Sequence, residues 1–579
     1  MRIKYFLHTI ILWASVAFIG CVSTAPRFQP GTYEGEGKGH GGDIRVLVTV
    51  TETDIKDIKI MSMQETAFLG DTAFATLKDR ILKANSTEVD VVSGATEASN
   101  GYISAVQDAL NKAGFVAVKK TKTQGRSKNL PAKSYDLVII GGGGAGLSAA
   151  NAAVAKGVRV VLFEKMGILG GNTIRATGGI NAAGTAIQAE KGIKDSPDLF
   201  FQDTMKGGYN KNDPELVKTL ATKSAASVSW LTDMGADLSD VGRLAGASVN
   251  RAHRPSGGAK VGPEIVKTLA NKAKQSATLS IFTDAEVRSL LTNKQGAVTG
   301  VVVRIDGKDY KVTAKAVVLA SGGFGANNEM AAKFNPALKG FATTNHAGAT
   351  GDGILMAQAI GAALVDMDQI QTHPTFAPDG NEMVTEAVRG NGAILVNSAG
   401  KRFVDELETR DVVSAKILAQ EGKIAYLVFD NSVRKSLSAI ESYLKAGFVL
   451  EAQNLADLAH KIGSTSETLE KTIKNYNDAV LSKKDTEYGR SDMPRTLSEA
   501  PYYAIKVTPA IHHTMGGVKI NTSAQVLRTD GSVIPGLYAA GEVTGGVHGG
   551  NRLGGNALAD IVTFGRIAGE NAVAYIMKK

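Results

Sequence analysis

A short apolar strand, a glycine-rich turn and a helix follow one another near residue 140, and they form the most distinctive hydrophobic pattern in the chain. The apolar run Tyr135–Ile140 is typical of a buried strand, and the alanine-rich residues after the turn follow a helical pattern. Between them, Gly141, Gly143 and Gly146 stand at G-x-G-x-x-G spacing. Such glycines allow a tight turn and a close approach of the backbone to a pyrophosphate, which the helix N-terminus attracts. The next apolar strand ends in Glu164, where an acidic residue can bind a ribose hydroxyl. The pattern therefore predicts a dinucleotide-binding site.

A second pattern, nearer the N-terminus, alternates apolar and polar residues. The alternation over 44–50 predicts a half-buried strand, with its apolar face formed by Ile44, Val46, Val48 and Val50. Isoleucines a few residues later suggest another short strand, and a helix is predicted to end near Ala113. The basic, polar stretch over 119–133 is typical of a solvated linker. We therefore predict a small α+β domain over 27–118, which the linker separates from the dinucleotide fold.

The length of the chain, its charge and its cysteine content narrow the possible functions. With 579 residues the chain is too long for one ordinary core, and two to four domains are expected. The net charge of +9 is modest for this length, and the basic linker has no interleaved aromatic residues, so we expect no nucleic-acid partner. The single cysteine excludes structural disulfides, cysteine-ligated iron–sulfur clusters, C-x-x-C-H haem attachment and thiolate zinc sites. No metal site is predicted, so any electron carrier in this chain must be organic.

That cysteine lies at the end of an N-terminal targeting pattern. Met1–Tyr5 is basic, Phe6–Ile19 is apolar but short for a membrane span, and a polar segment follows Cys21. The arrangement resembles a bacterial lipoprotein signal, which implies that residues 1–20 are removed and that Cys21 carries lipid. A plain secretory signal and an uncleaved anchor are the alternatives. All three predict export to the cell envelope, on the periplasmic or extracytoplasmic face, and the first adds a lipid anchor in the membrane.

The N-terminal domain carries a further motif, Asp-Val-Val-Ser-Gly-Ala-Thr, at Asp90–Thr96. Together with the glycine-rich opening at 31–42, this motif resembles the small FMN-binding domain whose FMN is joined by a phosphoester to a threonine. The resemblance implies covalent FMN on Thr96 and a flavin transferase that attaches it. From the residues alone, Thr96 is equally consistent with an ordinary helix-capping threonine.

Glycine-rich loops recur after the dinucleotide motif, at Gly167–Asn181, Ala320–Phe324, Thr344–Gly353 and Gly536–Glu542. In this order they resemble the flavoprotein superfamily of fumarate reductases and succinate dehydrogenases, whose dinucleotide is FAD. The soluble, single-subunit bacterial fumarate reductases are the most similar branch. Members with covalent FAD carry a histidine where this sequence has Asn172, which implies non-covalent FAD. The FAD-binding residues that the resemblance implies are Gly141, Gly143, Gly144, Ala145, Gly146, Glu164, Lys165, Gly171, Asn172, Thr173, Gly178, Gly179, Gly323, Asp352, Glu542, Ala557 and Leu558.

The same resemblance implies an α/β fold with a discontinuous, Rossmann-like FAD-binding domain. Its first part is expected over 134–367 and its second over 512–579. An inserted α+β domain, the clamp that caps the substrate, is expected over 368–511. The FMN-binding domain precedes both.

Five polar motifs in the clamp region and after it complete the resemblance. They are His373-Pro-Thr, predicted on a loop, and then Val384–Gly390, Lys401–Asp411, His512–Gly517 and Gly549–Gly555. The resemblance assigns Arg410 as the proton donor, with Glu386 and Arg389 as its relay. Two carboxylate-binding pairs are also implied: Arg552 with His512, and His373 with Thr385.

Spacing supports two of these assignments. Glu386 and Arg389 are three positions apart and would be neighbours on one helical turn. His513 competes with His512, but only His512 lies four residues before Gly516, as the family pattern requires. His548 is interpreted as structural.

We therefore expect reduction of fumarate, with hydride from FAD, a proton from Arg410 and electrons relayed through FMN. The expected donor is a membrane-associated, quinol-linked or cytochrome-like protein. The alternatives are the same chemistry on another 2-enoate, such as urocanate, methacrylate, acrylate or a cinnamate, and a flavin-carrying electron-transfer protein without turnover. Retention of His373 together with Thr385 favours a small dicarboxylate substrate.

Overall fold

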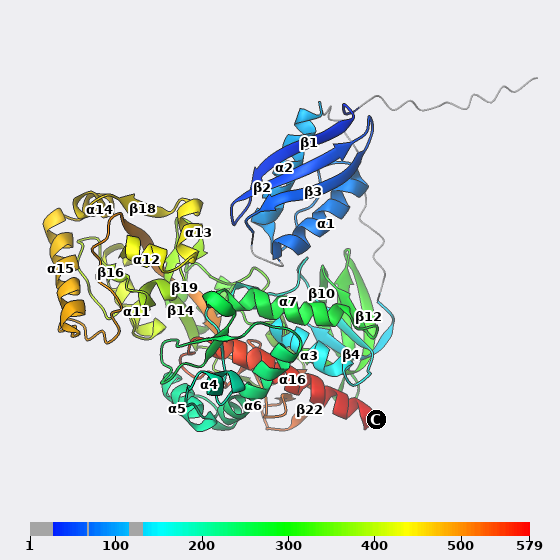
Figure 1. Ribbon diagram of the computed structural model, residues 1–579. Helices are drawn as coiled ribbons and strands as arrows, with labels where there is room; N and C mark the ends of the chain where they lie inside the picture. Colours follow the sequence, from blue (N-terminus) through cyan, green and yellow to red (C-terminus); the bar gives the residue numbers. More distant parts are fainter. Residues whose placement is uncertain (1–26, 66–68, 115–130, 579) are drawn as a thin grey trace, which may run out of the picture.

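The computed structural model describes residues 27–65, 69–114 and 131–578. The predicted signal peptide, the lipidation site Cys21 and most of the predicted linker therefore lie outside the described residues. Figure 1 shows an N-terminal body in blue, a central body that runs from cyan and green to red, and an inserted body in yellow. Each body has a hydrophobic core of its own. In the described part of the chain, no helix is both long and apolar enough to cross a membrane.

The N-terminal body is a three-stranded antiparallel sheet with two helices packed on it (Figure 1). The apolar side chains that alternate along its central strand are all buried, which confirms the predicted strand. The predicted second strand and the helix near Ala113 are also present. The sequence analysis missed one helix, although its buried residues Phe74, Leu77 and Ile81 have helical spacing. The elements are β1 (Gly31–Lys38), β2 (Asp43–Val50), β3 (Ile55–Met63), α1 (Leu69–Ala84) and α2 (Thr96–Lys112).

The glycine-rich opening of this body lets β1 lie directly on α2. A Cβ atom at Gly35 would lie 2.0 Å from the carbonyl oxygen of Ala105, and one at Gly37 would lie 2.2 Å from that of Gly101. Both neighbours are helix backbone, which cannot rotate away. The glycines are therefore required for close packing of strand and helix.

The central body is built on an eight-stranded sheet of order β10-β11-β12-β4-β5-β9, with β21 and β22 attached through β12. Strands β22, β12, β4, β5 and β9 are parallel to one another. Their carboxyl ends therefore meet at one edge, where ligands bind in open α/β sheets. The strands are β4 (Ser134–Ile140), β5 (Val160–Phe163), β9 (Leu279–Phe282), β10 (Ala285–Thr292), β11 (Val298–Ile305), β12 (Lys308–Leu319), β21 (Gln525–Leu527) and β22 (Val533–Ala539).

Helices cover this sheet, and three of them pack close to the glycine-rich turn: α3 (Gly144–Val154), α7 (Val261–Lys274) and α16 (Asn556–Met577). Helix α3 follows β4 through that turn, which confirms the predicted strand, turn and helix. The other helices of the body are α4 (Ala186–Glu190), α5 (Pro197–Gly207), α6 (Pro214–Asp233), α8 (Asn328–Phe334), α9 (Asp352–Ala359) and the 3-10 turns η1 (Thr173–Arg175), η2 (Ser256–Gly258) and η3 (Pro336–Leu338). Two small sheets complete it, formed by β6 (Ile180–Asn181), β7 (Asp240–Gly242) and β8 (Ala252–Arg254), and by β13 (Leu364–Val365), β20 (Gly517–Lys519) and β23 (Thr544–Gly545).

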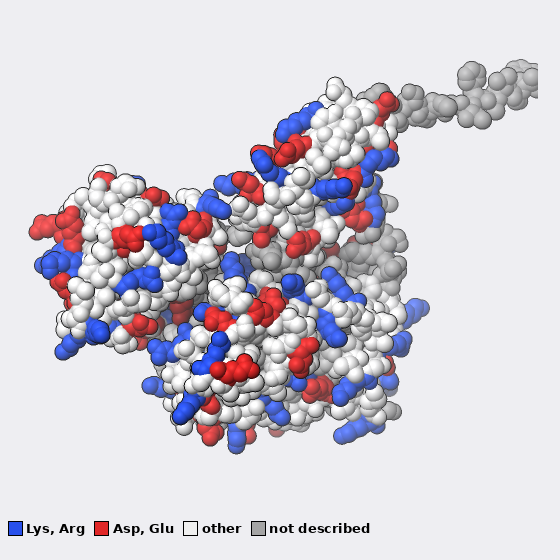
Figure 2. Space-filling model, viewed as in Figure 1, with Lys and Arg blue, Asp and Glu red and all other residues white. Residues whose placement is uncertain are grey.

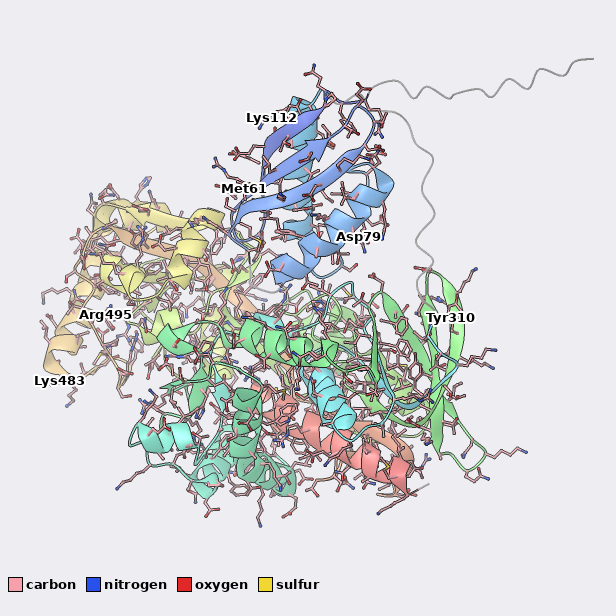
Figure 3. All side chains as sticks on the ribbon, turned by 45° about the vertical axis from the view of Figure 1, so that its right-hand side comes forward. Met61, Asp79, Lys112, Tyr310, Lys483 and Arg495 are labelled. Atoms are coloured by element: carbon pink, nitrogen blue, oxygen red, sulfur yellow. The ribbon has the colours of Figure 1, made fainter. Side chains whose placement is uncertain are left out.

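The inserted body is an antiparallel sheet of order β15-β14-β19-β17-β16 with helices on its outer side. Its strands are β14 (Ile370–Ala377), β15 (Glu382–Met383), β16 (Ile394–Val396), β17 (Ala425–Asp430), β18 (Val449–Ala452) and β19 (Tyr502–Thr514). Its helices are α10 (Ala387–Gly390), α11 (Arg410–Leu418), α12 (Asn431–Lys435), α13 (Ala439–Ala446), α14 (Leu455–Ile462), α15 (Ser466–Ser482) and the turn η4 (Glu421–Lys423). Figure 3 locates Lys483 and Arg495 on this body, Tyr310 on the central body, and Met61 and Asp79 on the N-terminal one.

Two strands join the central and inserted bodies. In β19, Val507 belongs to the inserted core and Ile511 to the central core, so the chain changes cores within one strand. The predicted domain boundary between residues 511 and 512 therefore lies inside β19. Strand β14 makes the same passage beside it in antiparallel register. A pair of strands, in place of loose loops, thus fixes how the inserted body approaches the central one.

The prediction that His373-Pro-Thr lies on a loop is wrong, because His373 lies within β14. Pro374 lacks an N–H group and would interrupt a regular ladder. The pairing of β14 with β19 is irregular between His373 and Phe376, and this irregularity accommodates the proline.

We predict that Gly35→Ala destabilises the N-terminal body by about 1–3 kcal/mol, because the new methyl group meets helix backbone. Amide hydrogen exchange in β1–β3 and α2 of the full chain measures this loss locally. Gly31→Ala is the matched control, since its Cβ would meet only the Tyr33 ring at 3.2 Å. Equal protection in the two variants would contradict the packing argument.

Candidate active site

The glycine-rich turn opens onto a cavity with an empty volume of about 840 Å³ at the carboxyl ends of the parallel strands. A Cβ atom at Gly143 would meet nothing closer than 3.9 Å, and one at Gly322 would meet nothing within 4 Å. The backbone therefore borders open space there. Gly146 differs, since its Cβ would lie 1.9 Å from the carbonyl oxygen of Gly141, so it serves the packing of the helix under the turn. This is the division of roles expected for the three glycines of a dinucleotide motif.

Most of the predicted FAD-binding residues line this cavity. They are Gly141, Gly143, Gly144, Ala145, Glu164, Lys165, Gly171, Asn172, Thr173, Asp352 and Glu542. The sequence analysis missed further lining residues on the loops that follow β12 and precede α9, among them Ser321, Gly322, His346, Gly348 and Ala349. They lie inside glycine-rich segments that the analysis had named, and the order of the loops after parallel strands could have found them.

The remaining predicted FAD-binding residues do not line the cavity: Gly146, Gly178, Gly179, Gly323, Ala557 and Leu558. Gly323 packs under it, because its Cβ would lie 2.0 Å from Thr514 Oγ1 and 2.8 Å from Glu542 Oε1. Gly178 and Gly179 follow Thr177, whose hydroxyl lies 3.3 Å from that of Thr385 in the inserted body. Ala557 and Leu558 lie in the first turn of α16.

Charged groups at the cavity wall are held in place by the surrounding backbone and by each other. Glu164 accepts hydrogen bonds from the backbone N–H groups of Gly142 at 2.7 Å and Met166 at 2.8 Å. Burial nevertheless raises the pKa of Glu164. Lys165 Nζ lies 2.6 Å from Asp352 Oδ2, which also lines the cavity.

Asn172 stands where the resemblance places the histidine of members with covalent FAD. It lies in a hydrogen-bond network at this wall. Its side-chain oxygen accepts from the backbone N–H of His346 at 2.7 Å, and its amide donates to Asn345 Oδ1 at 2.6 Å. The amide also lies 3.4 Å from Glu542 Oε2. Burial raises the pKa of Glu542, which accepts from the backbone of Thr514 at 3.0 Å.

Arg410, Glu386 and Arg389 meet as the sequence analysis predicted. Arg410, the first residue of α11, donates from Nε to Glu386 Oε2 at 3.0 Å, and its Nη2 lies 3.0 Å from the same oxygen. Glu386 precedes α10, and Arg389 Nη2 lies 3.8 Å from it. Burial opposes the charge of Glu386, but Arg410 and Arg389 outweigh it and hold its pKa below the usual value. A carboxylate is therefore placed between two guanidinium groups.

Gln371 is a central residue that the sequence analysis missed. Its side-chain oxygen accepts hydrogen bonds from Arg410 at 3.2 Å and from Arg552 at 3.0 Å. Its amide donates to Asn551 Oδ1 at 2.6 Å and to the carbonyl oxygen of Arg552 at 2.8 Å. One neutral oxygen is thus the shared acceptor of two cations. Burial and the charge of Arg410 lower the pKa of Arg552 to about 9, and Arg552 Nε is a buried donor without a partner among the described groups.

The histidine pair His373 and His512 lies beside these arginines, with ring centroids 5.1 Å apart. Desolvation, followed by the charge of Arg410, lowers the pKa of both rings well below the usual value, so both are neutral near pH 7. His512 Nδ1 lies 2.7 Å from the hydroxyl of Thr344. The geometry therefore brings His512, and not its neighbour, to His373.

His513 and His548 form a separate pair. Their ring centroids are 5.2 Å apart in an edge-to-face arrangement, and His548 Nε2 lies 3.2 Å from Asp560 Oδ2. Thr385 is linked to His373 through β14. The residue before Thr385, Val384, is hydrogen-bonded to Thr375 of β14. The Thr375 hydroxyl lies 3.4 Å from His373 Nδ1.

A buried ion network, also missed by the sequence analysis, lies behind Arg389. Arg490 donates to the carbonyl oxygen of Arg389 at 2.7 Å and to Glu406 Oε2 at 3.0 Å. Glu406 also binds Arg402 through both oxygens, at 3.0 and 2.9 Å, and Arg389 donates to the Glu406 carbonyl oxygen. Arg402 in turn lies 3.0 Å from Asp485. The network satisfies the carboxylates that it buries and fixes the backbone of α10.

Comparison with known proteins decides the family. The model of the FAD binding domain matches residues 136–558, and the model of the FMN-binding domain matches residues 39–111. The chain belongs to this FAD-binding family.

Curated relatives agree with this assignment. The enzyme is 54% identical over 465 residues to a fumarate reductase (cytochrome) of Shewanella frigidimarina, which spans 80% of this chain and 81% of the relative. It is 42% identical over 548 residues to an NADH:fumarate oxidoreductase of Klebsiella pneumoniae (strain 342), across 94% of this chain and 59% of the relative. It is 34% identical over 562 residues to a urocanate reductase of Eggerthella lenta, across 94% of this chain and 92% of the relative.

A solved structure gives the same result. The open conformation of a flavocytochrome c3 fumarate reductase superposes with a TM-score of 0.69 at 45% identity, and covers 77% of this chain and 79% of that chain. The enzyme is therefore a flavoprotein oxidoreductase acting on CH–CH donors, with a domain for FAD and a second domain for FMN.

We predict that Gln371→Glu weakens binding of the dicarboxylate malonate at least about tenfold. The substitution places an anion between Arg410 and Arg552 and leaves less positive charge for a ligand carboxylate. Displacement titration against the FAD-loaded enzyme measures the affinity. Gln369→Glu, two residues earlier and just before the same strand, is the matched control and should change affinity little. Equal effects of the two substitutions would contradict this assignment.

Proposed function

We propose that this enzyme reduces the C=C bond of fumarate to succinate. The observation that supports the proposal is the cluster around Arg410: Arg410 and Arg552 share Gln371 as an acceptor, and His373 lies beside His512. We assign Arg552 with His512 to one substrate carboxylate and His373 with Thr385 to the other. A dicarboxylate needs two such pairs, and a mono-acid needs one. The 54% identity to a fumarate reductase supports the same choice.

The first task of these residues is to bind and polarise the substrate. A guanidinium can bind a carboxylate through two parallel hydrogen bonds, and Arg552 has a buried donor free for this among the described groups. Neutral His512 and His373 donate hydrogen bonds without adding to the positive charge already present. The combined positive field of Arg552 and Arg410 stabilises electron density that accumulates on the carboxylate in the transition state.

The second task is proton delivery. Reduced FAD, held by the residues that line the cavity, would supply a hydride to one alkene carbon. The electron pair of the former π bond then takes a proton at the neighbouring carbon, and we assign Arg410 as the donor of that proton. Glu386, 3.0 Å from Arg410, returns a proton to it, and Arg389 lies next along the same path. The buried ion network behind Arg389 keeps this path in register.

The cavity suits FAD, since its glycines border open space and Ser321 Oγ is a buried polar atom without a partner among the described groups. Asn172 at its wall supports non-covalent binding. The second domain suits FMN attached to Thr96, because Thr96 is exposed, begins α2 and follows Ala95, which has no side-chain cap. Such attachment requires a flavin transferase.

Export and the electron donor complete the proposal. The basic and apolar N-terminal pattern supports export, with lipid on Cys21 holding the enzyme at the outer face of the membrane. A quinol-linked or cytochrome-like membrane protein would then supply electrons, which pass through the FMN domain. Figure 2 shows basic and acidic side chains interspersed over one face of all three bodies, so charge on this face does not single out a docking patch for the donor.

Another 2-enoate is the second candidate substrate, because the urocanate reductase matches nearly the whole of this chain. The two candidates share Arg410 and its relay. They differ in the need for the second carboxylate-binding pair.

We predict that the flavin-loaded enzyme, with reduced viologen as anaerobic donor, turns over fumarate at least about a hundredfold faster than urocanate, methacrylate, acrylate or caffeate. A hundredfold difference corresponds to about 2.7 kcal/mol in the transition state, which is within the roughly 1.5–3 kcal/mol of a hydrogen bond to a charged group. Preference for a mono-acid would overturn the dicarboxylate assignment and keep the 2-enoate reductase. Absence of turnover with every acceptor would refute the proposal.

We also predict that acid denaturation releases FAD and leaves FMN on the protein. Absorbance of the supernatant and the intact mass of the precipitate measure the two flavins separately. Thr96→Ala should remove the bound FMN mass, while Thr87→Ala in the same body should keep it. FMN that is released with the FAD, or that persists in Thr96→Ala, would contradict the attachment site.

A further inference from the structure

The turn that carries Thr96 touches the central body at the edge of the FAD cavity. The hydrophobic core of the N-terminal body contains one residue from outside it, Ile168, which is 3% exposed. Ile168 follows Glu164 and Lys165 of the cavity wall. A Cβ atom at its neighbour Gly167 would lie 3.0 Å from Val92 Cγ1, so the loop is seated tightly against the FMN-bearing turn. A residue of the FAD-binding body thus completes the core of the FMN-binding body.

His346 reaches the same turn from the cavity side. Its Nδ1 accepts a hydrogen bond from the backbone N–H of Gly348 at 3.0 Å, so the ring proton of the neutral tautomer lies on Nε2. Nε2 is buried and has no partner among the described groups, and a Cβ atom at Gly94 would lie 2.9 Å from it. Desolvation lowers the pKa of His346 to about 4, so the ring is neutral near pH 7. A neutral donor therefore points at the turn two residues before Thr96.

Arg175 brings a positive charge to this junction. It lies in η1, three residues after Asn172, and its side chain is exposed. In the described part of the chain no hydrogen bond or ion pair engages its guanidinium. The carboxylates whose charges act on it are Glu97, next to Thr96, and Glu382 of the inserted body. The charge is thus near the FMN-bearing turn without a fixed partner.

The first turn of α2 supplies the remaining donors. Thr96 begins the helix, and Ala95 before it offers no side-chain cap, so the N–H groups of the first turn are available for an anion. The diester phosphate that links FMN to a threonine is an anion. His346 Nε2, buried and unpartnered beside this helix end, and Arg175 are the central body's matching donors.

We propose that Ile168, His346 and Arg175 form a docking site for the FMN-bearing turn of the same chain. Ile168 anchors the turn by its apolar side chain. His346 Nε2, Arg175 and the first N–H groups of α2 bind the phosphodiester of FMN attached to Thr96. The inference rests on the proposed attachment of FMN to Thr96, and it places that flavin's phosphate beside the wall of the FAD cavity.

Further contacts between the N-terminal body and the other two bodies are consistent with this docked arrangement. Arg80 donates to the backbone carbonyls of Asp90 and Val91 in the turn, and its Nη2 lies 3.8 Å from Asp284 of the central body. Lys445 of the inserted body donates to Gln64 at 2.8 Å. The N-terminal body therefore contacts both of the others.

The experiment compares docking in the full chain carrying FAD and FMN, in wild type, Arg175→Gln and Ile168→Ala. Small-angle X-ray scattering and the rate of protease cleavage in the predicted linker over 119–133 both report undocking of the N-terminal body. Both variants lie outside that body, so intact mass should show FMN attached as in wild type. Arg304→Gln, an exposed arginine paired with Asp309 on the central sheet, is the matched control.

We expect both variants to increase linker cleavage at least about tenfold and to enlarge the particle, whereas the control does neither. Thr96→Ala, which lacks the phosphodiester, should undock similarly, and adding Arg175→Gln to it should have little further effect. Unchanged docking in Arg175→Gln and Ile168→Ala would overturn the site. If Arg175→Gln increases linker cleavage by the same factor in Thr96→Ala as in the wild type, the role of the phosphodiester is overturned. That result would instead indicate that Arg175 acts on the FAD cavity.

The failure of this inference is distinguishable from failure of the proposed function. Reduced viologen can reach FAD directly, so fumarate turnover with viologen tests the reductase independently of docking. Absence of that turnover in the wild type, with Arg175→Gln and Ile168→Ala both undocked as expected, would reject the reductase and keep the docking site. Intact turnover with no docking difference among the variants would reject the docking site alone.

Discussion

Two guanidinium groups that share one neutral acceptor are the constraint on which the site depends. Arg410 and Arg552 both donate to the side-chain oxygen of Gln371, and like charges this close repel one another. An anion between them removes that repulsion. Under the proposed function, a substrate carboxylate supplies that anion. Burial, followed by the charge of Arg410, lowers the pKa of Arg552.

The fold supplies these groups from segments far apart in the chain. Gln371 and His373 lie on β14, His512 on β19, Arg410 at the start of α11, and Arg552 just before α16. The antiparallel pair β14 and β19 passes from the central core to the inserted core, so both bodies contribute to one site through continuous strands. The network of Arg490, Glu406 and Arg402 then fixes α10 from behind, where removal of one partner would leave a buried charge unpaired.

The sequence predicts the local parts of this arrangement well. The alternation in β2, the glycines of the dinucleotide turn and the i,i+3 spacing of Glu386 and Arg389 each encode local geometry, and each is found. Family resemblance, and not periodicity, pointed to His373, Thr385, Arg410 and Arg552 as candidates. Spacing also favoured His512 over His513, and the structure brings His512 to His373.

Other parts could not be predicted, because they depend on contacts between distant residues. Gln371 is an ordinary polar residue in the sequence, and only the folding of β14 against the segment around Arg552 reveals it as the shared acceptor. Arg490 belongs to no motif, Glu406 lies inside the Lys401–Asp411 motif without an assigned role, and Ile168 is one apolar residue in a glycine-rich loop. The position of His373 in a strand was mispredicted because Pro374 suggests a break, whereas the irregular pairing of β14 absorbs it.

The most direct test of the central claim is the single-turnover oxidation of FAD-reduced enzyme by fumarate, compared between wild type and Arg410→Gln. The account predicts that Arg410→Gln slows flavin oxidation by about a thousandfold, because Arg410 is the group of the site that is assigned to donate the proton. It also predicts that fumarate affinity changes less than about tenfold, since Arg552, His512, His373 and Thr385 remain. Oxidation at the wild-type rate, or a loss confined to affinity, would contradict the assignment of Arg410 as the acid.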